Sequence, residues 1–114
     1  MLVIEDDEDF RAVICLQLQR AGYQVIDVED AGAAWDVARE QQLQAVVVDF
    51  RLPGIDGRTV ARQLRASLPD IPLIGFTSWP DDLAGSTSPF DTVLTKPDVA
   101  PLIATLRRFT SRAT

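Results

Sequence analysis

Acidic, hydroxyl and ammonium side chains follow four short apolar runs of this 114-residue sequence. The set consists of Glu5, Asp6, Asp49, Thr77, Ser78 and Lys96. A carboxylate held beside a divalent cation can attack a phosphoryl group and form an acyl phosphate. An ammonium group can then offset charge on the phosphoryl oxygens, while a hydroxyl group donates a hydrogen bond to one of them. These residue types therefore predict phosphoryl chemistry at a metal-binding site.

Three of these residues are carboxylates that the sequence places close together. Glu5 and Asp6 follow the apolar run 2–4, and Asp49 follows the run 45–48. Carboxylates at close quarters repel and raise one another's pKa values unless a cation lies among them. The sequence contains no histidine and only one cysteine, Cys15. The ligands are therefore oxygens, which favours Mg²⁺ or Mn²⁺.

An alternation of strands and helices is predicted to position these side chains. The predicted strands span 2–4, 24–28, 45–48, 73–76 and 93–94, and apolar residues recur at helical spacing over 10–21, 31–38, 60–68 and 99–109. This order predicts an α/β fold in which helices cover both faces of a five-stranded parallel sheet. The carboxyl ends of such strands meet at one edge, where ligands bind.

The segments that connect these elements contain residues typical of caps and turns. Asp7, Asp30 and Asp98 are predicted to cap the helices that follow them, and Asp56 the third helix. The acids at 7–9 are better explained by a solvated helix start than by metal binding. The stretch 52–57, with its proline and two glycines, predicts a loop.

Length and composition limit the class of protein. We expect one domain over residues 1–114, since this length leaves no room for a second. The net charge of −6 disfavours nucleic acid as a direct partner. No apolar run approaches the ~18 residues of a membrane helix, so membrane insertion is not expected. A lone cysteine and the absence of a signal-like start predict a cytoplasmic location.

Four stretches of the sequence, in register, carry a resemblance to a known family. They are 4–7 (IEDD), 48–57 (VDFRLPGIDG), 76–78 (FTS) and 94–97 (LTKP). Together they resemble the signature stretches of response-regulator receiver domains of two-component phosphorelays, and the likeness covers essentially the whole chain. The residues of the second and fourth stretches are most similar to those of receiver domains in hybrid sensor histidine kinases. The resemblance implies a flavodoxin-like three-layer sandwich with strand order 2-1-3-4-5.

The resemblance also implies a role for each acidic residue. Asp49 would be the phosphoacceptor, modified from a phosphohistidine. Asp6 and Asp49 would bind Mg²⁺ directly, Glu5 through water, and Arg51 through its backbone carbonyl. The partner implied is a histidine kinase or a histidine phosphotransfer protein, and a homodimer is also compatible with the family.

The remaining site residues would contact the phosphoryl group. Thr77 and Ser78 would provide the switch hydroxyl groups, and Lys96 the phosphate-binding ammonium group. The peptide bond between Lys96 and Pro97 is predicted to be cis, as the family resemblance implies. Such a bond would aim the ammonium group at Asp49.

The sequence departs from the family in two places. An aromatic residue usually stands three positions before the lysine, where this chain has Val93. The segment 78–91 is short and contains Pro, Gly and Ser residues that interrupt a helix. We expect at most a short helix at 80–84 within a mobile, irregular loop. Both departures fall on the usual output surface of the family.

Three other functions are compatible with parts of the sequence. A haloacid-dehalogenase-type phosphohydrolase also uses an aspartate after a parallel strand, but it needs an acid at the position of Arg51. A flavodoxin-like cofactor binder would not carry five acids, 5–9, in its first loop. A pseudo-receiver would keep the fold and act only as a docking module. For a receiver domain we expect no enzyme activity on a separate substrate, only phosphoryl transfer to and from the domain itself.

Overall fold

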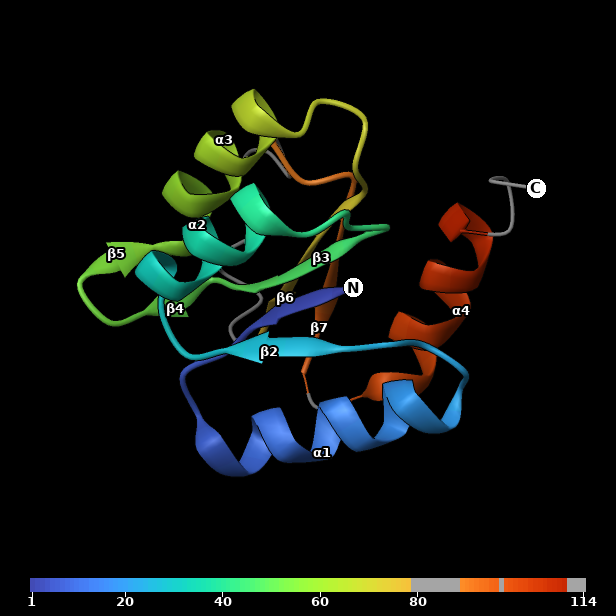
Figure 1. Ribbon diagram of the computed structural model, residues 1–114. Coiled ribbons are helices and arrows are strands. Elements are labelled where there is room, and N and C mark those ends of the chain that lie inside the picture. Colours follow the sequence, from blue (N-terminus) through green and yellow to red (C-terminus); the bar gives the residue numbers. More distant parts are fainter. Residues whose placement is uncertain (79–88, 97, 111–114) are drawn as a thin grey trace.

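The computed structural model describes residues 1–78, 89–96 and 98–110 (Figure 1). Its strands are β1 (Leu2–Ile4), β2 (Ile26–Val28), β3 (Val46–Asp49), β4 (Arg51–Leu52), β5 (Ile55–Asp56), β6 (Leu73–Thr77) and β7 (Thr92–Thr95). Its helices are α1 (Glu8–Arg20), α2 (Ala31–Glu40), α3 (Gly57–Ser67) and α4 (Val99–Thr110). The helix predicted at 80–84 and the cis peptide predicted before Pro97 lie outside the described residues.

Five parallel strands form the main sheet in the order β2-β1-β3-β6-β7. Counted along the chain, this is the predicted order 2-1-3-4-5 of a flavodoxin-like fold. The central strands β1, β3 and β6 are buried along their whole length, because helices cover both faces of the sheet. The edge strands β2 and β7 are partly exposed. The register is set by pairs such as Asp49 opposite Phe76 and Gly75 opposite Val93.

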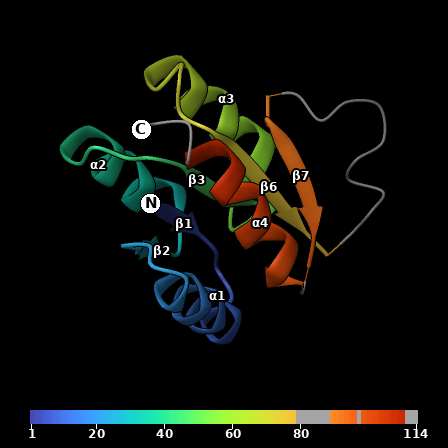
Figure 2. The same cartoon turned by 90° about the vertical axis from the view of Figure 1, so that its right-hand side faces the viewer.

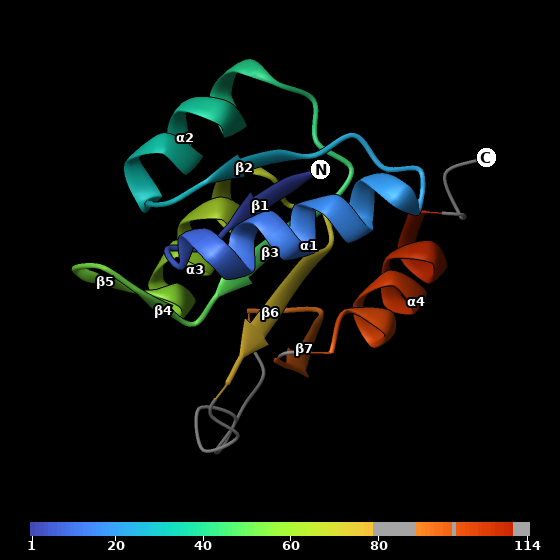
Figure 3. The ribbon, with the colours of Figure 1, turned by 90° about the horizontal axis from the view of Figure 1, so that it is seen from below.

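The helices form two layers, and each layer closes one hydrophobic cluster against the sheet. Helices α2 and α3 lie on one face, and α1 and α4 on the other (Figures 1 and 2). Figure 3, seen from below, shows α1 in front of the sheet with α4 beside it, and the two helices contact each other. Successive strand residues point to opposite faces, so Val46 and Val48 face α2 and α3 while Val47 faces α1 and α4. No helix in the described ranges is long and apolar enough to cross a membrane.

Aspartate side chains cap the N-termini of three helices, which begin close to the carboxyl edge of the sheet. The side chain of Asp7 accepts a hydrogen bond from the backbone N–H of Phe10 (3.1 Å), and that of Asp30 accepts one from Ala33 (2.8 Å). Asp56 caps α3 in the same way. All three caps were predicted, and each satisfies a backbone N–H that the first turn of a helix leaves without a partner.

A short antiparallel hairpin replaces the loop predicted at 52–57. Strands β4 and β5 pair with Arg51 opposite Asp56, and the turn between them contains Pro53 and Gly54. Gly54 has a φ of 73°, a left-handed conformation that glycine adopts without strain. The turn residues were recognised in the sequence, but the residues on either side of the turn pair as two short strands instead of forming a loop. The hairpin leads the chain from the end of β3 into α3.

An ion pair fixes the start of β7 at the opposite edge of the sheet. Arg65 in α3 contacts Asp91 (2.7 Å) and also donates to the carbonyl groups of Pro69 and Ile71. The same oxygen of Asp91 accepts a hydrogen bond from the N–H of Leu73 at the start of β6 (2.7 Å). One carboxylate therefore joins α3, β6 and the chain entering β7.

Replacing Asp91 should lower the free energy of unfolding, and the loss should be larger when more of its contacts with Arg65 and Leu73 are removed. Asp91→Ala is expected to lower the free energy of unfolding by about 1–3 kcal/mol, because the Leu73 N–H and Arg65 both lose their acceptor. Asp91→Asn should cost less, since an amide oxygen can still accept from Leu73. Urea denaturation measures both. Asp36→Ala, which removes an exposed ion pair with Arg39, should cost less than about 1 kcal/mol. Equal losses for Asp91→Ala and Asp36→Ala would contradict the expectation.

Candidate functional site

The carboxyl ends of four strands meet at one edge of the sheet and bring the predicted residues together. Glu5 follows β1, Asp49 ends β3, Thr77 ends β6, and Lys96 follows β7. Two backbone hydrogen bonds fix this edge. The N–H of Glu5 donates to the carbonyl of Val28 (3.0 Å), and the N–H of Lys96 donates to the carbonyl of Thr77 (2.7 Å). The sequence-based placement of these residues at a common edge is therefore correct.

Lys96 places the positive charge of the site directly against two carboxylates. Its Nζ donates a hydrogen bond to Oε1 of Glu5 and lies 3.3 Å from Oδ1 of Asp49. The Lys96 side chain is 13% exposed and that of Glu5 is 3% exposed. Because water is largely excluded, the attraction between these charges is weakly screened.

Glu5, Asp6 and Asp49 form what we call the acidic cluster. Each offers one carboxylate oxygen, and the three oxygens lie within 4.8 Å of one another. Glu5 and Asp49 are buried, whereas Asp6 is exposed. Oε2 of Glu5 is buried and has no hydrogen-bond partner within the described part of the chain. A buried carboxylate oxygen of this kind needs a partner, and a cation at the cluster would provide one.

The pKa values of the acidic cluster show the same need for a cation. Burial raises the pKa of Glu5 to about 8; the neighbouring Asp49 adds to this rise, and Lys96 opposes it. Burial also raises the pKa of Asp6, again with a contribution from Asp49. Negative charge is therefore disfavoured here unless a cation compensates it. Since all the donors are carboxylate oxygens, a hard divalent cation such as Mg²⁺ or Mn²⁺ fits the cluster.

The backbone on both sides of Asp49 is held by the hairpin and by the first residue of α3. The N–H of Arg51 donates to Oδ1 of Asp49 (3.2 Å), and the N–H of Gly57 donates to the carbonyl of Phe50 (2.8 Å). A Cβ at Gly57 would lie only 2.2 Å from the carbonyl oxygen of Asp49. The missing side chain at Gly57 thus allows α3 to begin directly against the phosphoacceptor candidate.

The two hydroxyl residues predicted for the site differ in exposure. Thr77 is buried at the end of β6, and Ser78 is exposed. Ser78 lines an open cavity of about 330 Å³ together with Glu5, Asp7, Phe10 and Lys96. The cavity gives solvent access to the ammonium group from the side of α1. The phosphate-binding roles of these residues remain predictions, as does the metal-ligand role of the backbone carbonyl of Arg51.

Two residues of the first helix contribute to the site and were not singled out in the sequence. The ring of Phe10 lies beneath the ammonium group of Lys96, with Nζ 4.9 Å from the ring centroid. Arg11 donates to the carbonyl of Glu5 (2.8 Å) and to the carboxylate of Asp27 (3.1 Å). Helical spacing had assigned Phe10 to the core, which is correct for one side of its ring only. Nothing in the spacing distinguishes Arg11 from a surface arginine.

A family model described as the response regulator receiver domain matches residues 1–107 of this chain. The transcriptional regulatory protein AfsQ1 of Streptomyces coelicolor is 35% identical over 100 residues, which cover 85% of this chain and 44% of that protein. The transcriptional regulatory protein PrrA of Mycobacterium tuberculosis is 35% identical over 122 residues, covering 100% of this chain and 52% of that protein. The chain therefore spans about half the length of these curated relatives.

A solved structure agrees with these matches. The receiver domain of the sensor histidine kinase PA1611 from Pseudomonas aeruginosa has a TM-score of 0.85 and is 30% identical. The likeness covers 96% of this chain and 95% of that one. That crystal structure has a magnesium ion coordinated in its active-site cleft. Because the matches include both transcriptional regulators and a sensor kinase, the hybrid-kinase origin remains a prediction.

Gly57→Ala should destabilise the domain by displacing the backbone at Asp49. The added Cβ would meet backbone atoms, which cannot move aside as a flexible side chain can. We expect a loss of about 1–3 kcal/mol in the free energy of unfolding, typical of overpacking. Gly32→Ala is the matched control, because its Cβ would lie 3.5 Å from Asp30, an ordinary contact. Urea denaturation compares the two variants, and wild-type stability of Gly57→Ala would contradict the expectation.

Proposed function

The chain belongs to the response regulator receiver domain family, and on that basis we propose that Asp49 accepts a phosphoryl group in a two-component phosphorelay. The donor would be the phosphohistidine of a histidine kinase or of a histidine phosphotransfer protein. One observation carries the proposal: the buried carboxylate of Asp49 lies 3.3 Å from the ammonium group of Lys96, beside two further acids. This arrangement pairs an acceptor oxygen with the charges that phosphoryl transfer requires.

The proposed transfer moves one phosphoryl group from nitrogen to oxygen. An oxygen of the Asp49 carboxylate forms a bond to phosphorus while the P–N bond of the phosphohistidine breaks. The electron pair of the broken bond remains on the imidazole nitrogen, and the chain gains an acyl phosphate. Negative charge is then spread over three phosphoryl oxygens. The ammonium group of Lys96 would offset part of this charge, and the hydroxyl groups of Thr77 and Ser78 would donate hydrogen bonds to the same oxygens.

Mg²⁺, or Mn²⁺, is the cofactor that we propose for the acidic cluster. Asp6 and Asp49 would bind the ion directly, Glu5 through water and Arg51 through its backbone carbonyl. The bound ion would supply positive charge against the carboxylates and the phosphoryl oxygens. Oε2 of Glu5, which has no hydrogen-bond partner among the described residues, and the raised pKa values of Glu5 and Asp6 support this assignment.

The geometry gives less support to the alternatives. A haloacid-dehalogenase-type hydrolase would need an acidic side chain at Arg51, whose N–H instead donates to the Asp49 carboxylate. A pseudo-receiver that acts only in docking has no use for buried carboxylates. Burial of Glu5 and Asp49 costs free energy, and apolar side chains would avoid that cost. Retention of these buried acidic side chains favours chemistry at the site.

Acetyl phosphate with Mg²⁺ should add one phosphoryl group to the wild-type chain, and intact-mass spectrometry measures it. The adduct should be absent from Asp49→Asn, because an amide oxygen is a poor nucleophile. Asp36→Asn, an exposed position on α2, is the matched control and should accept the group as the wild type does. Hydroxylamine should remove the adduct, as expected of an acyl phosphate. An equal adduct on Asp49→Asn would disprove the assignment, and no adduct on the wild type would favour a pseudo-receiver.

Metal binding should depend on the acidic cluster and not on the whole acidic run. We expect Asp6→Asn to weaken Mg²⁺ binding by at least about tenfold, since even groups that only support metal ligands contribute about 10–100-fold. Glu8→Gln removes a neighbouring charge from the exposed start of α1 and should retain affinity close to that of the wild type. Titration calorimetry measures both variants. Equal affinities for the two would place the ion outside the cluster.

A further inference from the structure

We infer that Phe10 is a positioning residue for the proposed phosphoryl transfer, because its ring holds the Lys96 ammonium group where it faces Asp49. The inference rests on the proposed function and adds a residue of α1 to that site. The key contact is the one between Nζ of Lys96 and the ring of Phe10, whose centroid is 4.9 Å away. A cation over the face of an aromatic ring is attracted by the negative charge density of that face.

The lysine side chain needs such support because it is long and flexible. Four rotatable bonds separate the ammonium group from the backbone, so that one orientation must be selected from many. Among the described residues, its other contacts are Glu5 and Asp49. Both of these carboxylates are also proposed to hold the metal ion, and Asp49 is proposed to accept the phosphoryl group. The ring of Phe10 therefore contacts the ammonium group without taking part in metal binding or in phosphoryl transfer.

The ring is itself fixed from two directions. The backbone N–H of Phe10 donates to the capping side chain of Asp7, which sets the first turn of α1. One side of the ring packs on Phe76, with centroids 5.7 Å apart and planes tilted by 55°. Phe76 is buried in β6 and directly precedes Thr77. Phe10 is thus held by the core and by the helix cap while it contacts the ammonium group.

The position of Phe10 also makes this contact accessible from outside. Phe10 is partly exposed and lines the open cavity of about 330 Å³ with Ser78 and Lys96. The ring and the ammonium group therefore line the same solvent-accessible space beside the acidic cluster. Loss of the ring should therefore affect the transfer itself without removing any group that binds the metal ion.

A spectroscopic experiment tests the contact without any phosphoryl transfer. Lys96 is the sole lysine of the chain, so the unphosphorylated protein labelled with [¹³Cε]lysine gives one ε-methylene signal by NMR. The ring current of Phe10 should shift the attached protons to higher field. Phe10→Leu should move the signal to lower field, and Phe10→Tyr, which retains a ring, should restore it. An unchanged signal in Phe10→Leu would overturn the inference.

A kinetic experiment tests whether the contact matters for the chemistry. With acetyl phosphate and Mg²⁺, Phe10→Leu should form the Asp49 adduct about threefold to tenfold more slowly, which corresponds to the usual strength of a cation–ring contact. Phe10→Tyr should recover most of the rate. Phe109→Leu is the matched control, since Phe109 is a partly buried ring on α4 that packs on the same hydrophobic cluster as Phe10. It should leave both the rate and the NMR signal unchanged.

The outcomes separate this inference from the function on which it rests. If the wild type is phosphorylated and Phe10→Leu reacts equally fast, Phe10 is no positioning residue and the proposed function stands. An equal slowing by Phe109→Leu would reduce the effect to general destabilisation and would also overturn the inference. If the wild type accepts no phosphoryl group, the proposed function fails, and the NMR signal still reports whether Phe10 holds the ammonium group.

Discussion

Compensation of buried negative charge at the carboxyl edge of the sheet is the constraint on which this structure depends. Glu5 and Asp49 are buried at this edge, and the ammonium group of Lys96 contacts both. Lys96 stands 91 positions after Glu5, beyond the last strand of the sheet. The charges are therefore compensated only when the first and the last strands have both joined the sheet. Removing the lysine would leave a buried charge without a partner, which costs more than the loss of an exposed pair.

Rigid supports around the edge hold these charges at close range. β3 is buried on both faces and ends at Asp49, so the carboxylate extends from a strand that cannot shift without disturbing both hydrophobic clusters. Gly57 lets the start of α3 lie directly against that strand end. Arg11 ties the carbonyl of Glu5 to Asp27, which links the end of β1 to β2. The polar site thus depends on elements that are mostly apolar, because close packing permits few alternative positions.

Much of this arrangement could be predicted from the sequence, and the parts that could not have a common physical cause. Apolar periodicity and aspartate caps located the strands and helices, since both are local signals of about one turn or one strand in length. Strand order and the roles at the site came from the family resemblance. The hairpin at 51–56 and the bridge from Arg65 to Asp91 were missed, because pairing between segments leaves no periodic trace in either one. Phe10 was assigned to the core, because helical spacing shows which face of a helix packs on the core. It does not show what contacts the exposed side of a ring on that face.

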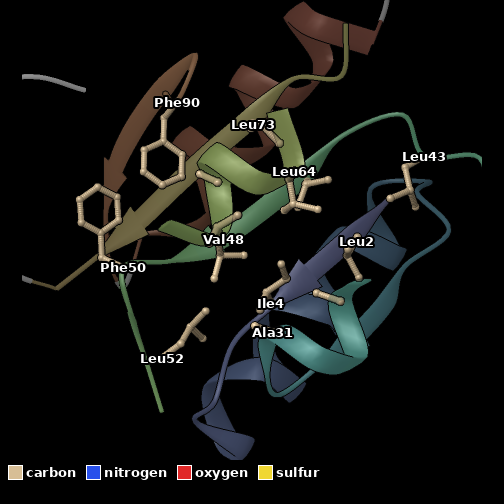
Figure 4. Packing of buried hydrophobic residues seen from close by; sticks show 14 residues of the cluster. Leu2, Ile4, Ala31, Leu43, Val48, Phe50, Leu52, Leu64, Leu73 and Phe90 are labelled. Atoms are coloured by element: carbon tan, nitrogen blue, oxygen red, sulfur yellow. The ribbon is translucent and has the colours of Figure 1, made fainter. Parts of the chain in front are cut away.

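Where the family usually has an aromatic residue this chain has Val93, and two rings, Phe50 and Phe90, pack nearby on the α2–α3 side of the sheet. Val93 pairs in register with Gly75, whose missing side chain makes room for Phe50: a Cβ there would lie 2.5 Å from that ring. Phe50 stacks on Phe90 with centroids 5.0 Å apart, and both rings are seen together in Figure 4. Phe50 directly follows Asp49 in the chain. Phe50 and Phe90 are thus both packed into the core, and a ring that turns between buried and exposed positions at residue 93 is not available to this chain.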